Sequence, residues 1–466
     1  AISVRPDDSI EVLQQTMTDY GVGQVPVVSN SGALLGIVTR TDLIQHLFAP
    51  PDEGPDERRH EIAARLEQMV PPAWLERLHQ AAQVADEMDY ALYIVGGFCR
   101  DLLLGRPNVD IDLVVEGDAI ALAHRLQASA GGRVRSHTRF GTAKWILDDG
   151  DALDFVTART EFYLHPTALP EVERSSIKQD LHRRDFTINT LAIRLDGEHY
   201  GELLDFYGGE ADLRAGCIRV LHSLSFIEDP TRVLRAIRLE QRLGFEIEAR
   251  TLELIGNALG FLDRVSGDRI RHELFFLFQE PEPERGLARL QELGVLPRIH
   301  PGLRCDGWLL RKAATLRQAL PEWYESSWQP VAPEEDHDAL HGLALPADNV
   351  HHLYLALLAY RLVDDELETL IARINLGRSD TDLLHEIAAL RTRLSPLQVQ
   401  DVRPSEVVRL LEGFSGPALL VCWVATDSPR VRDHLRGYWE RDRHVKPILT
   451  GDDLKEMGLR PGPIYR

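Results

Sequence analysis

Residues 92–115 read LYIVGGFCRDLLLGRPNVDIDLVV, and this stretch decides how the first half of the chain folds. An apolar run ends on Gly96 and Gly97, a short segment follows, and a second apolar run contains Asp110 and Asp112. Side chains two residues apart on a strand project to the same face, so a strand here places the two carboxylates side by side. Bare carboxylates that close repel each other, which is atypical of a packed core.

A divalent cation between the carboxylates would remove this repulsion. Mg²⁺ favours one or two carboxylates, with waters and substrate phosphates completing its shell. Such a pair, holding two metal ions, can align a hydroxyl and a triphosphate for in-line phosphoryl transfer. The glycine pair lets backbone approach a phosphate, and the helix predicted after it offers N–H groups and a positive dipole end near Arg100. Asp101 is equally well explained as a structural partner of Arg100, and alternating aspartates alone are a weak signal.

Composition limits the class of protein. A chain of 466 residues with 44% hydrophobic and 27% charged residues is typical of a globular protein with two to four domains. No apolar run approaches the ~20 residues of a membrane helix, and no signal peptide is apparent, so we expect no membrane association. The four cysteines are scattered singly, which excludes a sequence-local zinc cluster and favours reduced thiols in a cytoplasmic protein. Because Ala1 already lies in sequence typical of a folded domain, we expect sequence upstream of it.

The net charge of −21 argues against a general nucleic-acid binder, because phosphate repels acidic surfaces on average. Local basic segments are nevertheless present at 133–144 and around 183–189. A third is a predicted helix with basic and apolar residues on opposite sides. Its basic side consists of Arg232, Arg235, Arg238 and Arg242. A solvated helix face is the alternative interpretation of this stripe.

Periodicity divides the chain into parts. Residues 1–48 predict a small α/β module, the proline-rich and charged range 49–71 predicts a linker, and 72–215 alternates strands with short helices. Beyond about residue 216 the apolar spacing is helical, and no convincing strand is found. The predicted strands are ALYIV (91–95), VDIDLVV (109–115), TAKWIL (142–147), ALDFVT (152–157) and TINTLAIRL (187–195).

Five blocks carry a family resemblance. The stretch VGGFCRDLLLGRPNVDID (95–112) resembles the first motif of the nucleotidyltransferases that build the CCA end of tRNA, a class shared with bacterial poly(A) polymerases. The other family blocks follow in order. They are LDFVTARTEFY (153–163) before a flexible loop, the sugar-reading RRDFTIN (183–189), the hinge LLDFYGGEADL (203–213) and the base-reading EDPTRVLRAIR (228–238).

The resemblance covers about residues 72–466 and implies the fold class α/β plus all-α. Residues 72–215 would form a polymerase-β-like nucleotidyltransferase head with a mixed sheet. Residues 216–284 would form a helical neck with the base-reading motif, and 285–466 a helical body and tail that bind tRNA through backbone shape. The segment 446–465 resembles the last helical subdomain of the family, which continues in relatives.

The resemblance also implies roles for single residues. Asp110 and Asp112 would be the catalytic ligands of Mg²⁺, with Asp154 a possible third acid, although two acids suffice. Asp229 and Arg232 would read the base of the incoming ATP or CTP, a helix N-cap being the alternative for Asp229. The full nucleotide-binding set is Gly96, Gly97, Arg100, Asp101, Asp154, Arg159, Arg183, Arg184, Asp185, Asn189, Asp229, Arg232, Arg235 and Arg238. In it, Arg183, Arg184 and Asp185 would contact the sugar and triphosphate, supported by Asn189.

The predicted function is template-independent addition of C, A or both to the tRNA 3′ end. The block RFGTAKW (139–145) favours the tRNA enzymes, because the poly(A) polymerases carry a GRRF-like signature instead. The segment 164–175 resembles the mobile loop of the tRNA enzymes. Two alternatives stay open, a bacterial poly(A) polymerase and a non-catalytic, nucleotide-sensing RNA-binding module.

The N-terminal stretch GQVPVVSNSGALLGIVTRTDLIQHL (23–47) resembles one CBS repeat. In that family Thr39 and Asp42 would contact the sugar or phosphate of an adenosine ligand. Such a site normally needs two repeats, so a structural or dimerising half-module is the alternative, and a homodimer through this module is possible. Long relatives with this layout include enzymes that add only the terminal A, which hints at a narrower specificity.

Overall fold

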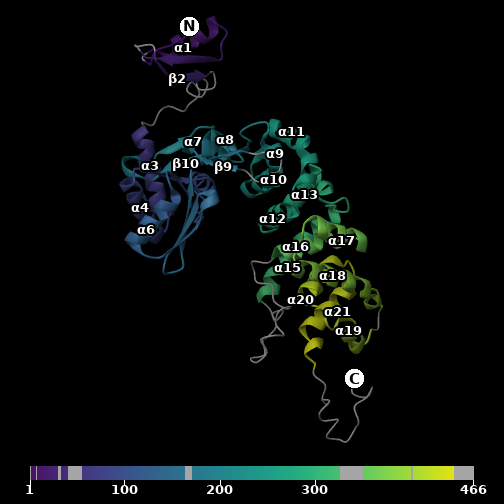
Figure 1. Ribbon diagram of the computed structural model, residues 1–466. Helices are drawn as coiled ribbons and strands as arrows, with labels where there is room; N and C mark the ends of the chain where they lie inside the picture. Colours follow the sequence, from purple (N-terminus) through teal and green to yellow (C-terminus); the bar gives the residue numbers. More distant parts are fainter. Residues whose placement is uncertain are drawn as a thin grey trace.

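The computed structural model describes residues 2–6, 8–29, 33–39, 55–162, 171–325, 350–399 and 402–445. In chain order these residues form a small N-terminal module, a mixed α/β head and a long succession of helices (Figure 1). This arrangement confirms the predicted class of α/β plus all-α.

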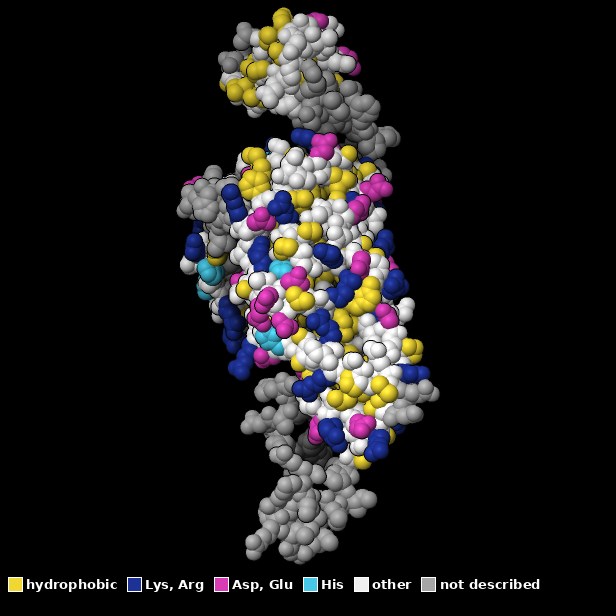
Figure 2. Space-filling model, turned by 90° about the vertical axis from the view of Figure 1, so that its right-hand side faces the viewer, with side chains coloured by type: hydrophobic (Ala, Val, Ile, Leu, Met, Phe, Trp, Pro, Cys, Tyr) yellow, Lys and Arg dark blue, Asp and Glu magenta, His cyan; other side chains and the backbone are white. Residues whose placement is uncertain are grey.

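The N-terminal module has its own small core. Helix α1 (Ile10–Asp19) packs on the antiparallel strands β1 (Gln24–Val28) and β2 (Leu34–Thr39). The buried side chains are Val4, Leu13, Met17 and Val25. Strand β2 instead exposes Leu34, Leu35 and Ile37, at 64%, 60% and 56% of their surface. Figure 2 accordingly shows hydrophobic side chains gathered on one side of the module.

The range 49–71, predicted as a linker, is mostly helix. Helix α3 (Pro55–Met69) precedes α4 (Pro72–Glu87), and it buries Ile62 and Leu66 completely or nearly so against the head. The proline and the acids that suggested a linker lie in the first helical turn, where both are favourable. The composition predicted a linker, although Ile62 and Leu66, four residues apart, indicate the buried side of a helix.

A seven-stranded mixed sheet forms the head, in the order β11-β10-β3-β4-β7-β6-β5. All neighbouring strands are antiparallel except β4 and β7, which are parallel. Helices α4 and α6 (Ala119–Ala130) pack on the sheet. The strands are β3 (Ala91–Val95), β4 (Asp112–Glu116), β5 (Arg133–His137), β6 (Thr142–Ile146), β7 (Ala152–Thr157), β10 (Leu191–Arg194) and β11 (Leu203–Asp205). Strand β5 was not predicted, because its charged, exposed edge position hides the alternation that marks a strand.

Shorter elements link the strands of the head. Strands β8 (Arg159–Phe162) and β9 (Glu171–Arg174) form a hairpin, so β9 occupies part of the predicted loop 164–175, while residues 163–170 lie outside the described ones. The other elements are α5 (Gly97–Leu103), η1 (Thr138–Phe140), α7 (Ile177–His182), η2 (Thr187–Asn189), η3 (Gly197–His199) and α8 (Gly209–Ala215).

Beyond residue 216 the described chain is helical, as predicted, apart from one short parallel pairing of β12 (Cys217–Ile218) with β13 (Glu246–Ile247). The neck helices are α9 (Ser225–Glu228), α10 (Arg232–Leu243), α11 (Ala249–Ala258), η4 (Leu259–Arg264) and α12 (Gly267–Phe278). The later helices are α13 (Pro283–Glu292), α14 (Leu296–Ile299), α15 (Gly307–Glu325), α16 (Val350–Ala359), α17 (Asp364–Arg373), α18 (Arg378–Arg393), η6 (Ser395–Gln398), α19 (Pro404–Leu411), α20 (Gly416–Ala425), α21 (Pro429–Glu440) and η7 (Asp442–His444). The predicted terminal subdomain at 446–465 lies outside the described residues.

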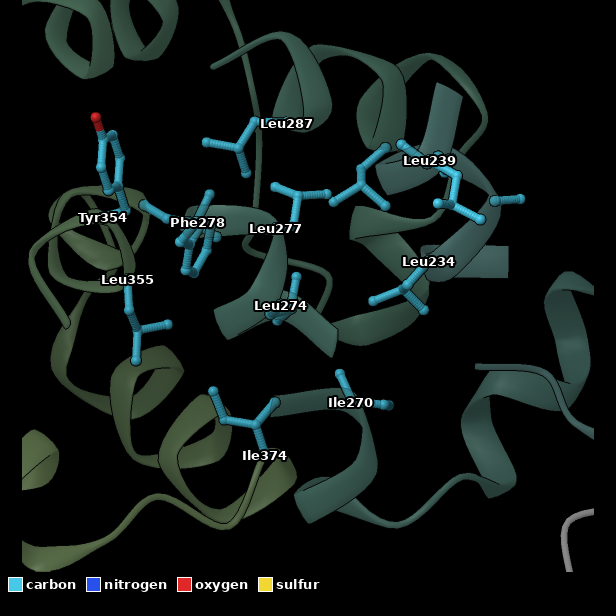
Figure 3. Packing of buried hydrophobic residues seen from close by; sticks show 14 of the residues in the cluster. Leu234, Leu239, Ile270, Leu274, Leu277, Phe278, Leu287, Tyr354, Leu355 and Ile374 are labelled. Carbon is cyan, nitrogen blue, oxygen red and sulfur yellow. The ribbon is translucent and has the colours of Figure 1, made fainter. Parts of the chain in front are cut away.

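Helix α12 connects the neck to the body through one continuous core (Figure 3). It packs against α10 on one side and α16 on the other. Its buried stripe consists of Ile270, Leu274, Leu277 and Phe278. Helix α12 therefore belongs to the packing of both the neck and the body.

The charged surface and the apolar helices bear on whether the chain contains a membrane span. On the face shown in Figure 2, basic and acidic side chains are interspersed over the helical half. Among the described helices none alone combines the length and apolarity needed to cross a membrane, whereas α19 and α20 together pass those criteria but meet at 113°. All four cysteines are free thiols.

Candidate active site

The two predicted catalytic acids lie together at the start of β4. The strand begins at Asp112 and not at residue 109, so Asp110 precedes it instead of sharing its pleat. Asn108 fixes this segment because its Oδ1 accepts from the Asp110 N–H at 2.8 Å. Asp112 pairs in register with Val95, the last residue of β3, which brings both acids beside the double glycine.

Both acids line a pocket of about 490 Å³ between the head and the neck. One wall comes from the head and consists of Gly97, Phe98, Arg100, Asn108, Asp110, Asp112 and Asn189. The other wall comes from α10, from α12 and from the two residues after α12, and it consists of Arg235, Arg238, Leu239, Arg242, Phe276, Gln279 and Glu280. The acids therefore face a largely basic surface of the neck.

The electrostatics of Asp112 fit a cation site. Desolvation by the pocket, together with the negative charges of Asp110 and Asp154, raises the pKa of Asp112, although Arg184 opposes the shift. Within the described part of the chain, no hydrogen bond or ion pair engages the Asp110 or Asp112 carboxylate. Oxygen donors left unpaired beside like charges are the donor set that Mg²⁺ prefers.

Asp154 lies next to Asp112 but is already paired. Strand β7 places it opposite Asp112 in the parallel register, and Lys144 Nζ on the neighbouring strand lies 2.9 Å from its carboxylate. The described residues contain no cluster of three or more acids, histidines or cysteines able to hold a metal ion. A site of two acids would take its other ligands from waters and substrate phosphates.

Gly96 is required by geometry. Its φ of 74° is disfavoured for other residues, and a Cβ there would lie 2.9 Å from Arg184 Nη1. The backbone turn before α5 thus lies directly over an arginine from the RRDFTIN block. Gly97 begins α5 and has more room, since a Cβ there would first meet Arg100 at 3.5 Å.

Asp180 organises the predicted phosphate-binding arginines, and sequence reasoning missed it. The side chain is fully buried, accepting from Arg183 Nη2 at 2.8 Å and from Arg184 Nη2 at 3.2 Å. Its Oδ1 also accepts from the backbone N–H of Arg159 at 3.3 Å. Burial alone would raise the pKa of Asp180, but Arg184 and Arg183 hold it below its ordinary value. Its spacing of three and four residues before the two arginines was the available signal.

A second network connects the head to the neck. Arg100 binds both oxygens of Asp101 at 2.9 Å, which supports the structural interpretation of Asp101, and it donates to Asn189 Oδ1 at 2.9 Å. Asn189 donates in turn to Asp185 Oδ1 at 2.9 Å, and Arg235 Nη1 donates to Asp185 Oδ2 at 3.2 Å. Burial opposes ionisation, but Arg235 and Asn189 hold the pKa of Asp185 below its ordinary value. The structure thus uses Asp185 to position Asn189 and Arg235.

The predicted base-reading residues are held by protein contacts and do not line the described pocket. Asp229 Oδ1 accepts from Thr231 Oγ1 and from Arg269 Nη2, both at 2.6 Å. Arg232 is buried, donating to Ser225 Oγ at 2.6 Å and to the Arg183 carbonyl at 2.8 Å.

The alternative role of Asp229 as a helix cap is seen in the turn that leads into α10. Asp229 is extended, and its Oδ1 accepts from the Thr231 N–H at 3.0 Å two residues on, as an N-cap side chain does, while the regular helix starts after Thr231. Arg269, one helix away, is the partner that the local sequence could not reveal.

Three of the predicted site residues, Arg159, Thr39 and Asp42, do not line the pocket or lie outside the described residues. Arg159 Nη1 donates to the Phe140 carbonyl at 2.9 Å, which ties the RFGT turn to β8. Thr39 is the last residue of β2, and Asp42 lies outside the described residues. Arg238, by contrast, lines the pocket.

Family models match three segments of the chain. The Poly A polymerase head domain matches residues 92–219, and the probable RNA and SrmB-binding site of polymerase A matches 244–306. The CBS domain matches residues 1–49. These segments coincide with the head, the first helices of the C-terminal half and the N-terminal module.

Relatives and solved structures agree with the family models. An A-adding tRNA nucleotidyltransferase of Geobacter sulfurreducens is 39% identical over 99% of this chain, and the chain spans about half of that protein's length, 53%. The enzyme of the same name from Halalkalibacterium halodurans is 34% identical, with 84% of this chain and 86% of that protein covered.

Among solved structures, an apo CCA-adding enzyme superposes with a TM-score of 0.74 at 33% identity, covering 87% of this chain and 92% of that one. The Thermotoga maritima CCA-adding enzyme complexed with tRNA superposes with a TM-score of 0.70 at 31% identity, over 87% of this chain and 91% of that one. Because the family models match the head and the first neck helices, and a relative is 34% identical with 86% of its length covered, the chain belongs to the family of tRNA nucleotidyltransferases that carry a poly(A)-polymerase-type head.

Proposed function

We propose that this chain transfers nucleotides, foremost the terminal A, from ATP to the 3′ hydroxyl of tRNA without a nucleic-acid template. The observation that carries this proposal is the position of Asp110 and Asp112. These neighbouring acids have no ion-pair partner among the described residues, and they lie in a pocket that faces the arginines of α10. The A-adding names of relatives matching nearly the whole chain support adenylation. CTP is a further substrate if the chain adds the whole CCA sequence.

The proposal includes Mg²⁺ held by Asp110 and Asp112. When bound, the metal would lower the pKa of the attacking hydroxyl and neutralise charge that develops on the triphosphate. The two carboxylates supply oxygen donors, and their mutual repulsion is relieved by a cation. Asp154 stays outside this site, because Lys144 already compensates its charge.

The other residues bind and orient the nucleotide. Arg184, held by Asp180 beneath Gly96, would contact the triphosphate, since guanidinium groups match phosphate oxygens. Asp229 and Arg232 would present an acceptor and donors to the base edge once the nucleotide displaces present contacts such as that of Arg269 with Asp229. A site that leaves buried polar groups unpaired with the wrong base rejects that base.

Two alternatives differ in a measurable way. A poly(A) polymerase shares the head, but the RFGT turn at 139–142 and the names of the relatives favour tRNA. A non-catalytic sensing module would not need two neighbouring carboxylates without ion-pair partners at the pocket.

The test is incorporation of one labelled nucleotide at a time into tRNAs that end before the first C, after the second C, or complete. Addition of a single A to the CC-ended tRNA alone identifies an A-adding enzyme. Stepwise addition of C, C and A identifies a CCA-adding enzyme, a long A ladder identifies a poly(A) polymerase, and no incorporation refutes catalysis.

The proposal includes a homodimer formed through the N-terminal module. The apolar residues exposed on β2, Leu34, Leu35 and Ile37, would be covered by a second copy of the module. Light scattering of the full chain and of Ile37→Lys tests this, because the dimer should dissociate on substitution, whereas a monomeric parent would refute it. The free thiols fit a cytoplasmic enzyme, and adenosine binding at Thr39 and Asp42 stays a prediction.

A further inference from the structure

The neck wall of the active-site pocket contains residues other than arginines, and no role has been given to them so far. We propose that this wall, through Phe276, Arg238 and Arg242, binds the 3′-terminal nucleotide of the acceptor RNA. Phe276 stacks on its base, and the two arginines contact its phosphate. The inference rests on the proposed function, since it presumes that an RNA end reaches Asp110 and Asp112.

Phe276 lies on the side of α12 where a polar residue is expected. The core stripe of this helix contains Ile270, Leu274, Leu277 and Phe278 (Figure 3). At ~100° per residue, Phe276 falls on the opposite side together with Gln279. The ring remains 37% exposed and lines the pocket. An exposed aromatic ring in a basic pocket is the platform on which single-stranded bases stack.

Arg238 is a cation whose carboxylate partners lie beyond hydrogen-bonding distance. Its guanidinium lies 4.9 Å from the centre of the Phe276 ring, and its nearest carboxylates, on Glu280 and Glu273, are 3.8 and 3.9 Å away. Its Nε is buried, and the described residues offer it no hydrogen-bond partner. By contrast, Arg235 on the previous turn is bound to Glu273 at 2.8 Å and to Asp185 at 3.2 Å. Arg238 therefore retains the capacity to bind a phosphate.

The position of the wall favours the RNA end over the incoming nucleotide. The base of that nucleotide is expected at Asp229 and Arg232, which precede the wall on α10 and do not line the described pocket. Phe276 and Gln279 belong to residues 244–306, which match the RNA-binding family model. An in-line reaction also requires the attacking hydroxyl to approach opposite the departing pyrophosphate. The wall facing the acids from the neck thus suits the attacking strand.

The experiment compares Phe276→Leu with a matched control, Phe261→Leu. Phe261 is also a neck phenylalanine under an arginine, Arg264 at 5.7 Å, but it does not line the pocket. We expect Phe276→Leu to raise the KM for tRNA ending in CC about tenfold, the size of one lost base stack. The KM for ATP should change less than about twofold. The control should change neither constant, and thermal melting checks that both variants fold.

Binding without ATP separates this inference from the proposed function. By fluorescence anisotropy, removing the last nucleotide of the tRNA should weaken binding to the parent chain about tenfold but leave binding to Phe276→Leu nearly unchanged. Arg238→Gln should reduce the salt dependence of RNA binding by about one unit of slope. A rise in the KM for ATP alone would assign the wall to the incoming base, and equal losses for both RNAs would leave it without a role. Either result overturns the inference, whereas failure of the parent chain to incorporate any nucleotide refutes the proposed function instead.

Discussion

Two pairs of aspartates in the head have opposite surroundings. Asp110 and Asp112 line an open pocket and make no ion pair with the described residues, and desolvation together with the charge of Asp110 raises the pKa of Asp112. Asp180 and Asp185 are buried, and each is bound by arginines that hold its pKa below the ordinary value. Buried acids with partners maintain structure, and exposed acids without them are available to a ligand. The chain thus separates positioning from chemistry among residues of one type.

The largest expected effect follows from removing a free acid. Asp110→Asn or Asp112→Asn should lower the rate of nucleotide incorporation about a thousandfold or more, because the oxygen donors for the cation are lost. RNA affinity should be unchanged. Single-turnover incorporation measures the rate, with Asp149→Asn, a surface acid paired to Arg77, as the control. Turnover near the parent rate in both variants would remove these acids from the site.

Removing a paired acid should act on stability instead. Asp180→Ala leaves Arg183 and Arg184 without their buried partner, which should lower the free energy of unfolding by about 3 kcal/mol. Urea denaturation measures this loss. A stability equal to that of the parent would contradict the positioning role, as would a stability loss of the same size in Asp112→Asn.

The pH dependence of stability should have opposite signs for Asp180 and Asp112. Since the pKa of Asp180 is depressed in the fold, its contribution is present above the unfolded pKa of about 3.9 and is lost as the pH falls through the folded value. Since the pKa of Asp112 is raised, its ionisation costs stability near neutral pH, and this cost disappears as the pH falls through the raised value. Asp112→Asn should therefore match or exceed the parent at pH 7. Unfolding curves from pH 7 to pH 3 check both signs.

A smaller effect is expected where an acid is paired but must become available. Arg269→Gln releases Asp229 from its 2.6 Å contact and should change the ratio of ATP to CTP incorporation several-fold. Competition between labelled ATP and CTP measures the ratio. The control is Arg264→Gln, which changes a neck arginine that does not line the active-site pocket. An unchanged ratio would mean that Asp229 does not read the base.

The smallest effect concerns the exposed pair of Lys144 and Asp154, both about half exposed. Lys144→Met should change the free energy of unfolding by less than about 0.5 kcal/mol, because exposed ion pairs contribute little. Thermal melting measures this. A large loss would show that Asp154 is held more like Asp180 than the structure indicates.

Local patterns in the sequence predicted the elements of the head and its acids well. Alternation and the double glycine located β3, β4, β7 and the acid pair, because these signals arise within a few residues. The charged edge strand β5 and the buried helix α3 escaped, since composition outweighed their weak periodicity. Asp180 and Arg269 escaped for another reason. Their importance arises from partners that the tertiary fold brings together, as Arg269 shows for Asp229, 40 residues earlier in the chain.

The most direct test of the central claim is to locate the cation. Crystals soaked with Mn²⁺ and a non-hydrolysable ATP analogue should give an anomalous peak between the Asp110 and Asp112 carboxylates, in contact with the triphosphate. A peak elsewhere, or none with the nucleotide bound, would contradict the account.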